Sequence, residues 1–208
     1  MKNIVVLVSG GGTNLQALID AEKNGIIKSG KITAVVSSNP NAYALERAEK
    51  NNIATAVIRR KDYEDFKSYD LALTDLLKSL NADLVVLAGF MTILGHEVIS
   101  AFENKMINIH PALIPSFCGE GFYGLRVHEA ALEKGVKLSG ATTHFVTEEC
   151  DAGPIIMQRA VEVKNDDTPE TLQRRIMENV EWKILPLSVE LFCSGKIRVK
   201  DNKTIISD

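Results

Sequence analysis

The chain has 208 residues, a length that fits one domain and allows a sizeable buried core. Hydrophobic residues make up 45% of it and charged residues 25%, a mixture that excludes a disordered chain and a fibrous protein. The net charge is -3 and the pI is near 5.9, so the composition provides no basic footprint for a nucleic-acid backbone. We therefore expect no nucleic-acid partner.

The start of the chain and its cysteines indicate the compartment. The apolar run 4–8, which ends at Ser9-Gly10, is too short for a signal peptide or a membrane span, so we expect a cytoplasmic protein without a membrane partner. Cys118, Cys150 and Cys193 are odd in number and lack C-x-x-C spacing. This pattern indicates reduced thiols rather than a disulfide framework or a zinc site, and no metal is expected.

The first hundred residues alternate between strand and helix patterns. Short runs rich in Val and Ile predict strands that are buried on both faces of a parallel sheet, at 4–8, 32–36, 53–58 and 84–88. Between them, apolar residues at helical spacing predict helices at 15–22, 42–50 and 69–80. This alternation predicts a Rossmann-like half of the chain, residues 1–104.

From residue 105 onward the pattern changes. We predict a strand at 106–111, a loop rich in Gly and aromatic residues, a short helix near 128–133, and an antiparallel pair of strands at 140–146 and 154–163. Thr168 and Pro169 begin a last long helix, which Pro186 is expected to kink or divide. The whole pattern predicts an α/β fold in one domain, 1–208, with a mainly parallel central sheet, an antiparallel C-terminal edge and flanking helices.

A glycine-rich loop, Ser9-Gly10-Gly11-Gly12-Thr13-Asn14, joins the first strand to the first helix. Free backbone N–H groups and the positive helix end converge there, so we predict an anion site, for phosphate in the first place. The loop is not a dinucleotide fingerprint, because Leu15 replaces the third glycine, and it is not a P-loop, because no Lys follows the glycines. The alternative is a tight turn that binds nothing.

Two polar side chains lie near the end of the strand at 106–111. Side chains alternate along a strand, so Asn108 and His110 point to the same side, and Pro111 closes the strand where α/β sheets bind their ligands. A titrating imidazole beside a fixed amide suits a reaction that generates an oxyanion. Asp151 lies in a turn before an apolar strand, where its carboxylate could hold the imidazole and favour its protonated form. The alternatives are a polar pair on a solvated strand and an Asp that caps its own backbone.

Four segments are similar to those of one family: S-G-G-G-T-N from Ser9, L-A-G-F-M-T-I-L from Leu87, N-I-H-P-A-L-I-P from Asn108 and H-F-V-T-E-E-C-D-A-G-P from His144. Over essentially its whole length the chain resembles the phosphoribosylglycinamide formyltransferases, folate-dependent enzymes of purine synthesis. The resemblance implies a Rossmann-like formyltransferase fold, with residues 1–104 binding the phosphorylated substrate and 105–208 carrying catalysis and folate binding. It implies that a formyl group passes from 10-formyltetrahydrofolate, a cosubstrate, to the glycinamide amine of phosphoribosylglycinamide, in a monomer or homodimer.

The resemblance also implies roles for single residues. The catalytic trio would be Asn108, His110 and Asp151. Substrate would be bound by Gly11, Gly12, Thr13, Asn14, Pro111 and Glu181, and folate by Lys67, Met91, Thr92, Ile93, Leu94, Asn108, Thr147 and Asp151. Lys67 is an incomplete match to the family's basic residue before Tyr-Asp, and Trp182 stands where the family commonly has His. The loop 117–123 is a longer variant from which no catalytic residue is carried over, and His96, His128 and His144 are expected to be structural.

Other functions stay open at this point. A formyl-folate hydrolase or a methionyl-tRNA formyltransferase would share the Asn-His-Asp arrangement. The chain length and the first loop favour the glycinamide enzyme, since the hydrolase would carry an additional amino-terminal module and the tRNA enzyme an additional carboxyl-terminal domain. A noncatalytic protein that binds a phosphorylated metabolite would use only the first loop and would leave Asn108, His110 and Asp151 without a function.

Overall fold

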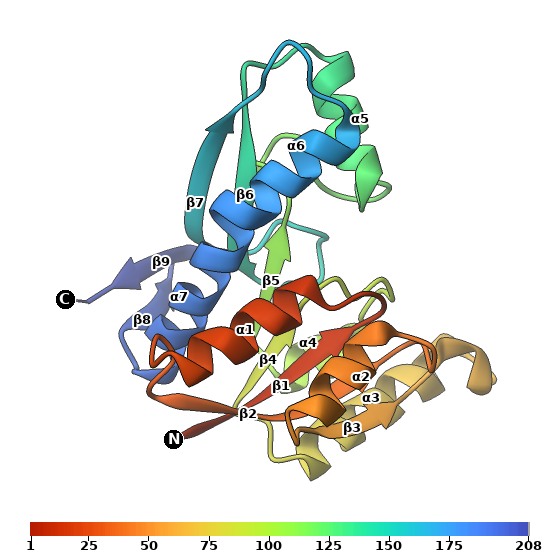
Figure 1. Ribbon diagram of the computed structural model, residues 1–208. Helices are drawn as coiled ribbons and strands as arrows, with labels where there is room; N and C mark the ends of the chain where they lie inside the picture. Colours follow the sequence, from red (N-terminus) through yellow and green to blue (C-terminus); the bar gives the residue numbers. More distant parts are fainter. Residues whose placement is uncertain (208) are drawn as a thin grey trace.

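A seven-stranded sheet forms the centre of the structure, a computed structural model that describes residues 1–207 (Figure 1). Its strands are β1 (Lys2–Val8), β2 (Gly30–Ser37), β3 (Ala54–Val57), β4 (Leu84–Leu87), β5 (Met106–His110), β6 (Leu138–Phe145) and β7 (Ile155–Glu162). They lie in the order β3-β2-β1-β4-β5-β6-β7. Strands β1 to β5 pair in parallel, whereas β6 is antiparallel to both β5 and β7. The predicted parallel sheet with an antiparallel C-terminal edge is confirmed.

Helices cover both faces of this sheet. They are α1 (Thr13–Lys23), α2 (Tyr43–Lys50), α3 (Phe66–Ser79), α4 (His96–Ala101), α5 (Leu125–Glu133), α6 (Pro169–Ile176) and α7 (Trp182–Cys193), with a 3-10 turn, η1 (Arg60–Asp62), before α3 and a π-helical turn, η2 (Met177–Glu181), between α6 and α7. Side chains of α1, α2, α5, α6 and α7 pack in one buried cluster, and those of α3 and α4 pack in another.

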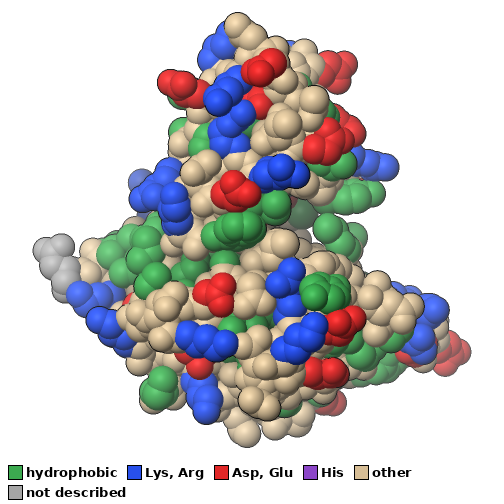
Figure 2. Space-filling view, in the orientation of Figure 1, with side chains coloured by type: hydrophobic (Ala, Val, Ile, Leu, Met, Phe, Trp, Pro, Cys, Tyr) green, Lys and Arg blue, Asp and Glu red, His purple; other side chains and the backbone are tan. Residues whose placement is uncertain are grey.

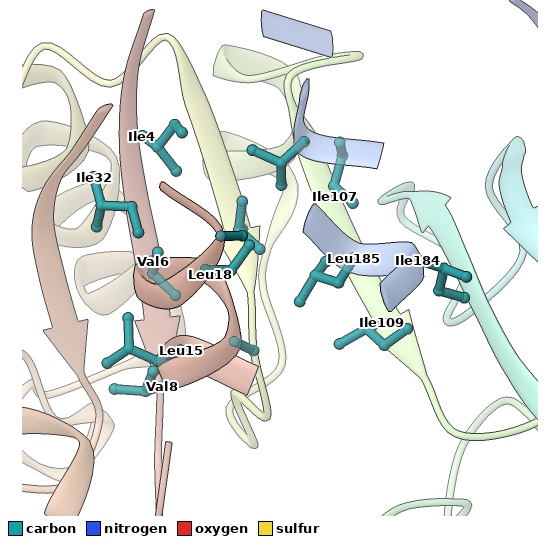
Figure 3. Close-up of a cluster of buried hydrophobic side chains, with 14 of the residues drawn as sticks. Ile4, Val6, Val8, Leu15, Leu18, Ile32, Ile107, Ile109, Ile184 and Leu185 are labelled. Atoms are coloured by element: carbon teal, nitrogen blue, oxygen red, sulfur yellow. The ribbon is translucent and has the colours of Figure 1, made fainter. Parts of the chain in front are cut away.

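The buried strand β1 explains how the two clusters form. Ile4, Val6 and Val8 point into the cluster under α1 (Figure 3). Val5 and Leu7 belong to the opposite cluster, under α3. All five side chains are fully buried. Because successive side chains of a strand face opposite sides, a continuous apolar run fits a strand that is covered on both faces.

Two expectations about the elements need correction, and one pair of strands was not expected. The run at 53–58 was expected to be buried on both faces, but β3 is the edge strand of the sheet and three of its four residues are exposed. Pro186 does not divide the last helix, because it lies inside α7, and the irregular segment is η2, directly upstream of α7. A second sheet, the hairpin of β8 (Ile197–Lys200) and β9 (Lys203–Ile206), was not predicted.

The ribbon separates into a lower part, which contains β1 to β4 and α1 to α4, and an upper part, in which the β6–β7 hairpin rises beside α5 and α6 (Figure 1). Strand β5 runs between these two parts. The space-filling view is hollowed where they meet, and basic and acidic side chains are interspersed over the visible face (Figure 2). Within residues 1–207, no helix is long and apolar enough to cross a membrane.

Candidate active site

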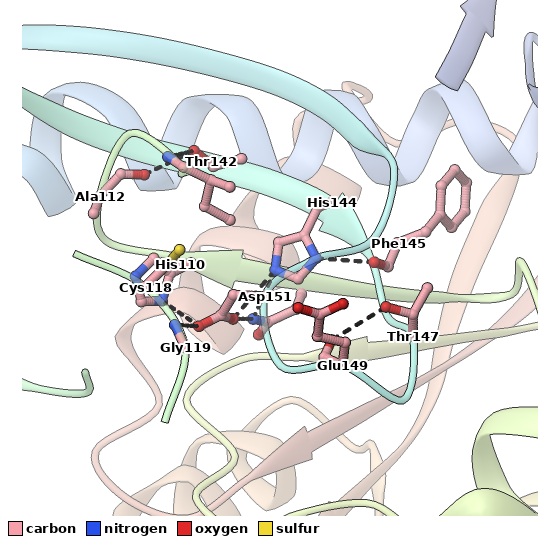
Figure 4. Close-up of polar contacts among 12 residues, drawn as sticks. His110, Ala112, Cys118, Gly119, Thr142, His144, Phe145, Thr147, Glu149 and Asp151 are labelled. Carbon is pink, nitrogen blue, oxygen red and sulfur yellow. Dashed lines mark hydrogen bonds and ion pairs between the residues drawn. The ribbon is translucent and has the colours of Figure 1, made fainter. Parts of the chain in front are cut away.

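The two polar side chains of β5 lie next to the carboxylate of Asp151. Asn108 Nδ2 is 3.4 Å from Asp151 Oδ1. His110 Nδ1 is 3.5 Å from Asp151 Oδ2, and both side chains are labelled in Figure 4. The side chains of His110 and Asp151 are almost fully buried. The structure therefore brings the three predicted catalytic residues together, although Asp151 comes from the connection between β6 and β7.

His144, which we expected to be structural, is the fourth member of this group. It lies on β6 directly opposite Asn108, with Nε2 3.1 Å from Asn108 Nδ2 and 3.5 Å from Asp151 Oδ1. Its Nδ1 is 2.9 Å from the Phe145 carbonyl, which only accepts, so this nitrogen carries a hydrogen. Nε2 faces both the Asn108 amide and the Asp151 carboxylate: a neutral ring accepts from Asn108 there and orients its amide, whereas a protonated ring donates to Asp151.

The charges of the group differ from our expectation. Burial lowers the pKa of His110 below its usual 6.5, and the nearby Asp151 opposes this effect only in part. Asp151 thus acts on the His110 pKa in the predicted, upward direction, but the expectation of a raised pKa is wrong, because the loss of hydration outweighs this attraction. Burial also disfavours the Asp151 anion, but hydrogen bonding from His144 and the charge of His110 outweigh burial and lower the Asp151 pKa to about 2.

The loop after β5 closes over the catalytic group. His110 Nε2 is 2.8 Å from the carbonyl oxygen of Phe117. The Gly119 N–H donates to Asp151 Oδ2 at 3.0 Å, a contact drawn in Figure 4. The Cys118 thiol, drawn beside them, donates to the Pro115 carbonyl at 3.3 Å. Since Phe117 O only accepts, His110 presents a donor on Nε2 to this side of the site.

The glycine-rich loop leaves the start of α1 open to a ligand. No side chain caps this helix end, so its first backbone N–H groups have no intrahelical partner. Arg47 of α2 donates to the Gly11 carbonyl at 2.8 Å and places a guanidinium beside the loop. A pocket of about 330 Å³ opens along α1, with Thr13, Arg47 and Trp182 in its wall.

Glu181 joins this loop to the last helices. It is buried, and Asn14 Nδ2 donates to its Oε2 at 2.7 Å. Burial raises the pKa of Glu181 to about 7, and the Asn14 hydrogen bond opposes that shift. Of the predicted substrate residues, the structure brings Gly11, Gly12, Thr13, Asn14 and Glu181 together, while Pro111 follows directly after β5.

The predicted folate residues lie in two loops that meet. Met91, Thr92, Ile93 and Leu94 follow β4, the parallel neighbour of β5, and Thr147 precedes Asp151. An ion pair between His96 and Glu148 connects the two segments. Lys67 is exposed on the first turn of α3 and forms no hydrogen bond or ion pair with residues 1–207.

Asp70 fixes the segment that contains Met91 to Leu94. This buried carboxylate accepts hydrogen bonds from the backbone N–H groups of Gly95 and Glu97, each at 2.8 Å, where α4 begins. The Ser9 hydroxyl receives the Met91 N–H at 2.9 Å at the other end of the segment. The sequence motif Tyr69-Asp70 thus has a structural role in this chain.

Sequence reasoning missed several polar groups. His144 and Arg47 become visible only when strands and helices pack, because each lies far along the chain from its partner. Arg59, Arg60 and Lys61 were also given no role, although they are visible in the sequence as a run of three basic residues. Among residues 1–207, no group of three or more His, Cys, Asp or Glu side chains is arranged to hold a metal ion.

Comparison with known proteins places these residues in a family. The formyl transferase family model matches residues 2–189. The chain is 42% identical to the phosphoribosylglycinamide formyltransferase of Haemophilus influenzae, over 97% of this chain and 92% of that protein. It is also 42% identical to the trifunctional purine biosynthetic protein adenosine-3 of Bos taurus, but it spans only 19% of that relative's length.

Solved structures agree with the sequence relatives. Glycinamide ribonucleotide transformylase 1 from Symbiobacterium toebii superposes with a TM-score of 0.94 and 40% identity, covering 100% of this chain and 95% of the other. A formyltetrahydrofolate deformylase from Pseudomonas syringae superposes with a TM-score of 0.87 and 30% identity, and this chain covers 66% of it. The chain therefore belongs to the formyl transferase family, together with the phosphoribosylglycinamide formyltransferases.

Proposed function

We propose that this protein transfers the formyl group of 10-formyltetrahydrofolate to the glycinamide amine of phosphoribosylglycinamide, a step of purine synthesis. The observation that carries the proposal is the group at the end of β5, in which Asn108 and His110 lie 3.4 Å and 3.5 Å from the carboxylate oxygens of Asp151. We also propose that the enzyme works in the cytoplasm, as a monomer or homodimer, on these small molecules and without a nucleic-acid or membrane partner.

The chemistry needs hydrogen-bond donors and a route for one proton. Attack of the amine on the formyl carbon places negative charge on the formyl oxygen, and each donor to such an oxyanion typically contributes about 3 to 4 kcal/mol. In the proposed reaction, the donors are the Asn108 amide and His110 Nε2. The Phe117 carbonyl, which now faces His110 Nε2 at 2.8 Å, would have to give up this donor to the formyl oxygen.

The protonation states of His110 and Asp151 suit a reaction in which His110 changes its charge. With its pKa lowered by burial, His110 is mainly neutral at neutral pH in the free protein. Asp151, an anion above about pH 2, lies beside it and would stabilise the imidazolium as the proton of the attacking amine is transferred to the leaving nitrogen. His144 would hold the Asn108 amide in the orientation that this step requires.

The two halves of the chain would divide the substrates. Residues 1–104 would supply the phosphate site, through Gly11, Gly12, Thr13 and Asn14, together with one side of the folate site, and residues 105–208 would supply the catalytic group and the other side of the folate site. Glu181 would reach across to the acceptor's ribose, since it already contacts Asn14. Met91 to Leu94 and Thr147 would border the pterin, and Lys67, exposed on the first turn of α3, would contact the folate.

The test measures tetrahydrofolate release from 10-formyltetrahydrofolate, with and without phosphoribosylglycinamide. We expect release only with the acceptor, together with one formylated acceptor for each tetrahydrofolate. Equal release without acceptor would identify a formyl-folate hydrolase, and no release under either condition, with phosphoribosylglycinamide bound, would identify a noncatalytic binding protein.

A further inference from the structure

Arg47 of α2 lies beside the glycine-rich loop, and none of the roles proposed above uses it. The loop leads into α1, and α1 and α2 pack on the same face of the sheet (Figure 1). Two consecutive carbonyls of the loop accept hydrogen bonds from α2. The Gly10 carbonyl accepts from the Ala44 backbone N–H at 3.1 Å. The Gly11 carbonyl accepts from Arg47 Nε at 2.8 Å, so this second contact depends on a side chain.

These two contacts decide where the donors of the loop point. In a trans peptide the carbonyl and the N–H point in opposite directions, so the carbonyls of Gly10 and Gly11 turn the N–H groups of Gly11 and Gly12 away from α2. Gly12 is left-handed, with φ +71°, and the right-handed first turn of α1 follows it. Such a change of hand aims successive N–H groups at a common point, where they bind an anion. Within residues 1–207, the N–H groups of Gly11, Gly12 and Thr13 have no acceptor.

The Arg47 guanidinium is itself held in place. Besides the Nε contact to Gly11, Nη1 donates to Gln16 Oε1 of α1 at 3.1 Å, and Cζ lies 5.0 Å from the centre of the Tyr43 ring. Arg47 forms no ion pair with residues 1–207, so no carboxylate draws Nε away from the loop. One planar group thereby fixes the Gly11 carbonyl relative to both helices.

The peptide that Arg47 holds would otherwise rotate easily. It lies between Gly11 and Gly12, and glycine on both sides offers little steric resistance to rotation. Rotation would replace the Gly12 N–H by a carbonyl oxygen, which repels a phosphate. A hydrogen bond to the Gly11 carbonyl is therefore the contact that keeps this donor available.

We propose that Arg47 is a positioning residue for the acceptor phosphate: its hydrogen bond to the Gly11 carbonyl holds the Gly12 N–H, on the other side of the same peptide, towards the phosphate. The inference rests on the proposed function, which places the phosphate at this loop. Arg47 acts through the peptide and not by touching the phosphate.

Three substitutions separate the hydrogen bond from the charge. Gln matches Arg as far as Nε, so Arg47→Gln removes the charge and keeps an N–H donor where Arg47 Nε contacts Gly11. Arg47→Met has a similar length and removes both the donor and the charge. Lys50→Met is the matched control, because Lys50 is a cation of the same helix, 5.4 Å from the centre of the same Tyr43 ring, but pairs with Glu46.

Binding of phosphoribosylglycinamide is measured by titration calorimetry and binding of inorganic phosphate by ³¹P NMR, together with the KM of both substrates. We expect Arg47→Met to weaken both ligands and to raise the acceptor KM by about tenfold, with the formyl-donor KM within about twofold. Arg47→Gln should stay within about threefold of the wild type, because the lost charge is partly exposed and screened. Lys50→Met should match the wild type, and thermal unfolding checks that each variant is folded at the assay temperature.

Three results would overturn the proposal. They are wild-type acceptor affinity in Arg47→Met, equal losses in Arg47→Gln and Arg47→Met, which would assign the effect to charge, and equal rises of both KM values, which would mean a role in the fold alone. The phosphate titration needs no turnover. A protein that binds phosphate, loses it in Arg47→Met and transfers no formyl group would therefore contradict the proposed function and leave the role of Arg47 standing.

Discussion

Gly11 and Gly12 are neighbours in the loop before α1, but they tolerate a side chain differently. Gly12 has φ +71°, and a Cβ atom there would lie 2.7 Å from Ala44 Cβ, whereas a Cβ at Gly11 would meet nothing within 4 Å. Packing against α2 is thus sufficient to explain why position 12 is a glycine. A substitution at Gly11, and not one at Gly12, therefore tests whether a ligand approaches the loop.

Gly11→Ala should leave the melting temperature unchanged and raise the acceptor KM by about tenfold, because the new methyl group stands between the backbone and the phosphate. Gly12→Ala should lower the free energy of unfolding by about 1 to 3 kcal/mol, through strain and overpacking. Thermal unfolding and steady-state kinetics of the two variants provide the comparison. An unchanged acceptor KM in Gly11→Ala would argue against phosphate binding at this loop.

Glu181 couples stability to pH. Its pKa in the folded protein is about 7, raised from 4.5, so the folded protein binds more protons than the unfolded chain between these values. This contribution to stability is fully present below pH 4.5 and is lost as the pH rises through 7. The loss amounts to roughly 3 kcal/mol at about 1.4 kcal/mol for each pKa unit.

Glu181→Gln removes this titration and retains an acceptor for Asn14. The variant should therefore melt several degrees above the wild type at pH 8 and lose that advantage at pH 5, and its acceptor KM should rise if Glu181 holds the ribose. The measurement is a series of thermal denaturation curves between pH 5 and 8. A difference between the two proteins that does not vary with pH would mean that Glu181 is not the titrating group.

At the scale of elements, Asp70 of α3 organises the start of α4. Its buried carboxylate accepts from Gly95, Glu97 and, more weakly at 3.4 Å, Val98. Asp70→Ala should lower the free energy of unfolding by about 2 to 4 kcal/mol, because a helix cap is lost and buried N–H groups are left without acceptors.

The same change should raise the KM of the formyl donor more than that of the acceptor, since Met91 to Leu94 lie between Ser9 and the Asp70 contacts. Thr74→Val is the matched control, because Thr74 is buried on the same helix but its hydroxyl contacts only the Asp70 carbonyl. Steady-state kinetics are measured at a temperature where both variants are folded. This separates the effect on the KM values from the loss of stability. An equal rise of both KM values would mean that Asp70 supports the fold alone.

The elements differ in how far the sequence predicts them. The buried strands β1 and β4 can be predicted from the sequence, because an apolar run fits a strand that is covered on both faces. The run 53–58, which contains the edge strand β3, is also apolar apart from Thr55, and only the sheet order reveals the exposure of β3. The β8–β9 hairpin could have been found, because Asp201-Asn202 occurs between alternating residues and both have the positive φ of a type I′ turn.

At the scale of the whole molecule, the sequence predicts those parts of the candidate site whose residues lie close together in one sequence motif. Asn108 and His110 lie on one strand, so their common side follows from the period of two. The contacts of His144 and Arg47 depend on which strands and helices pack together, and the lowered His110 pKa depends on burial by the whole fold. None of these is a property of a local segment.

The central claim is that Asn108 and His110 act on one developing oxyanion. The most direct test is the formyl-transfer turnover number of Asn108→Ala, His110→Ala and the double variant, with folate affinity measured alongside. Each single change should lower turnover by roughly a hundredfold or more and leave folate affinity within several-fold, and the double variant should lose less than the product of the single losses. Turnover close to that of the wild type in either single variant, or losses that multiply strictly, would contradict the account.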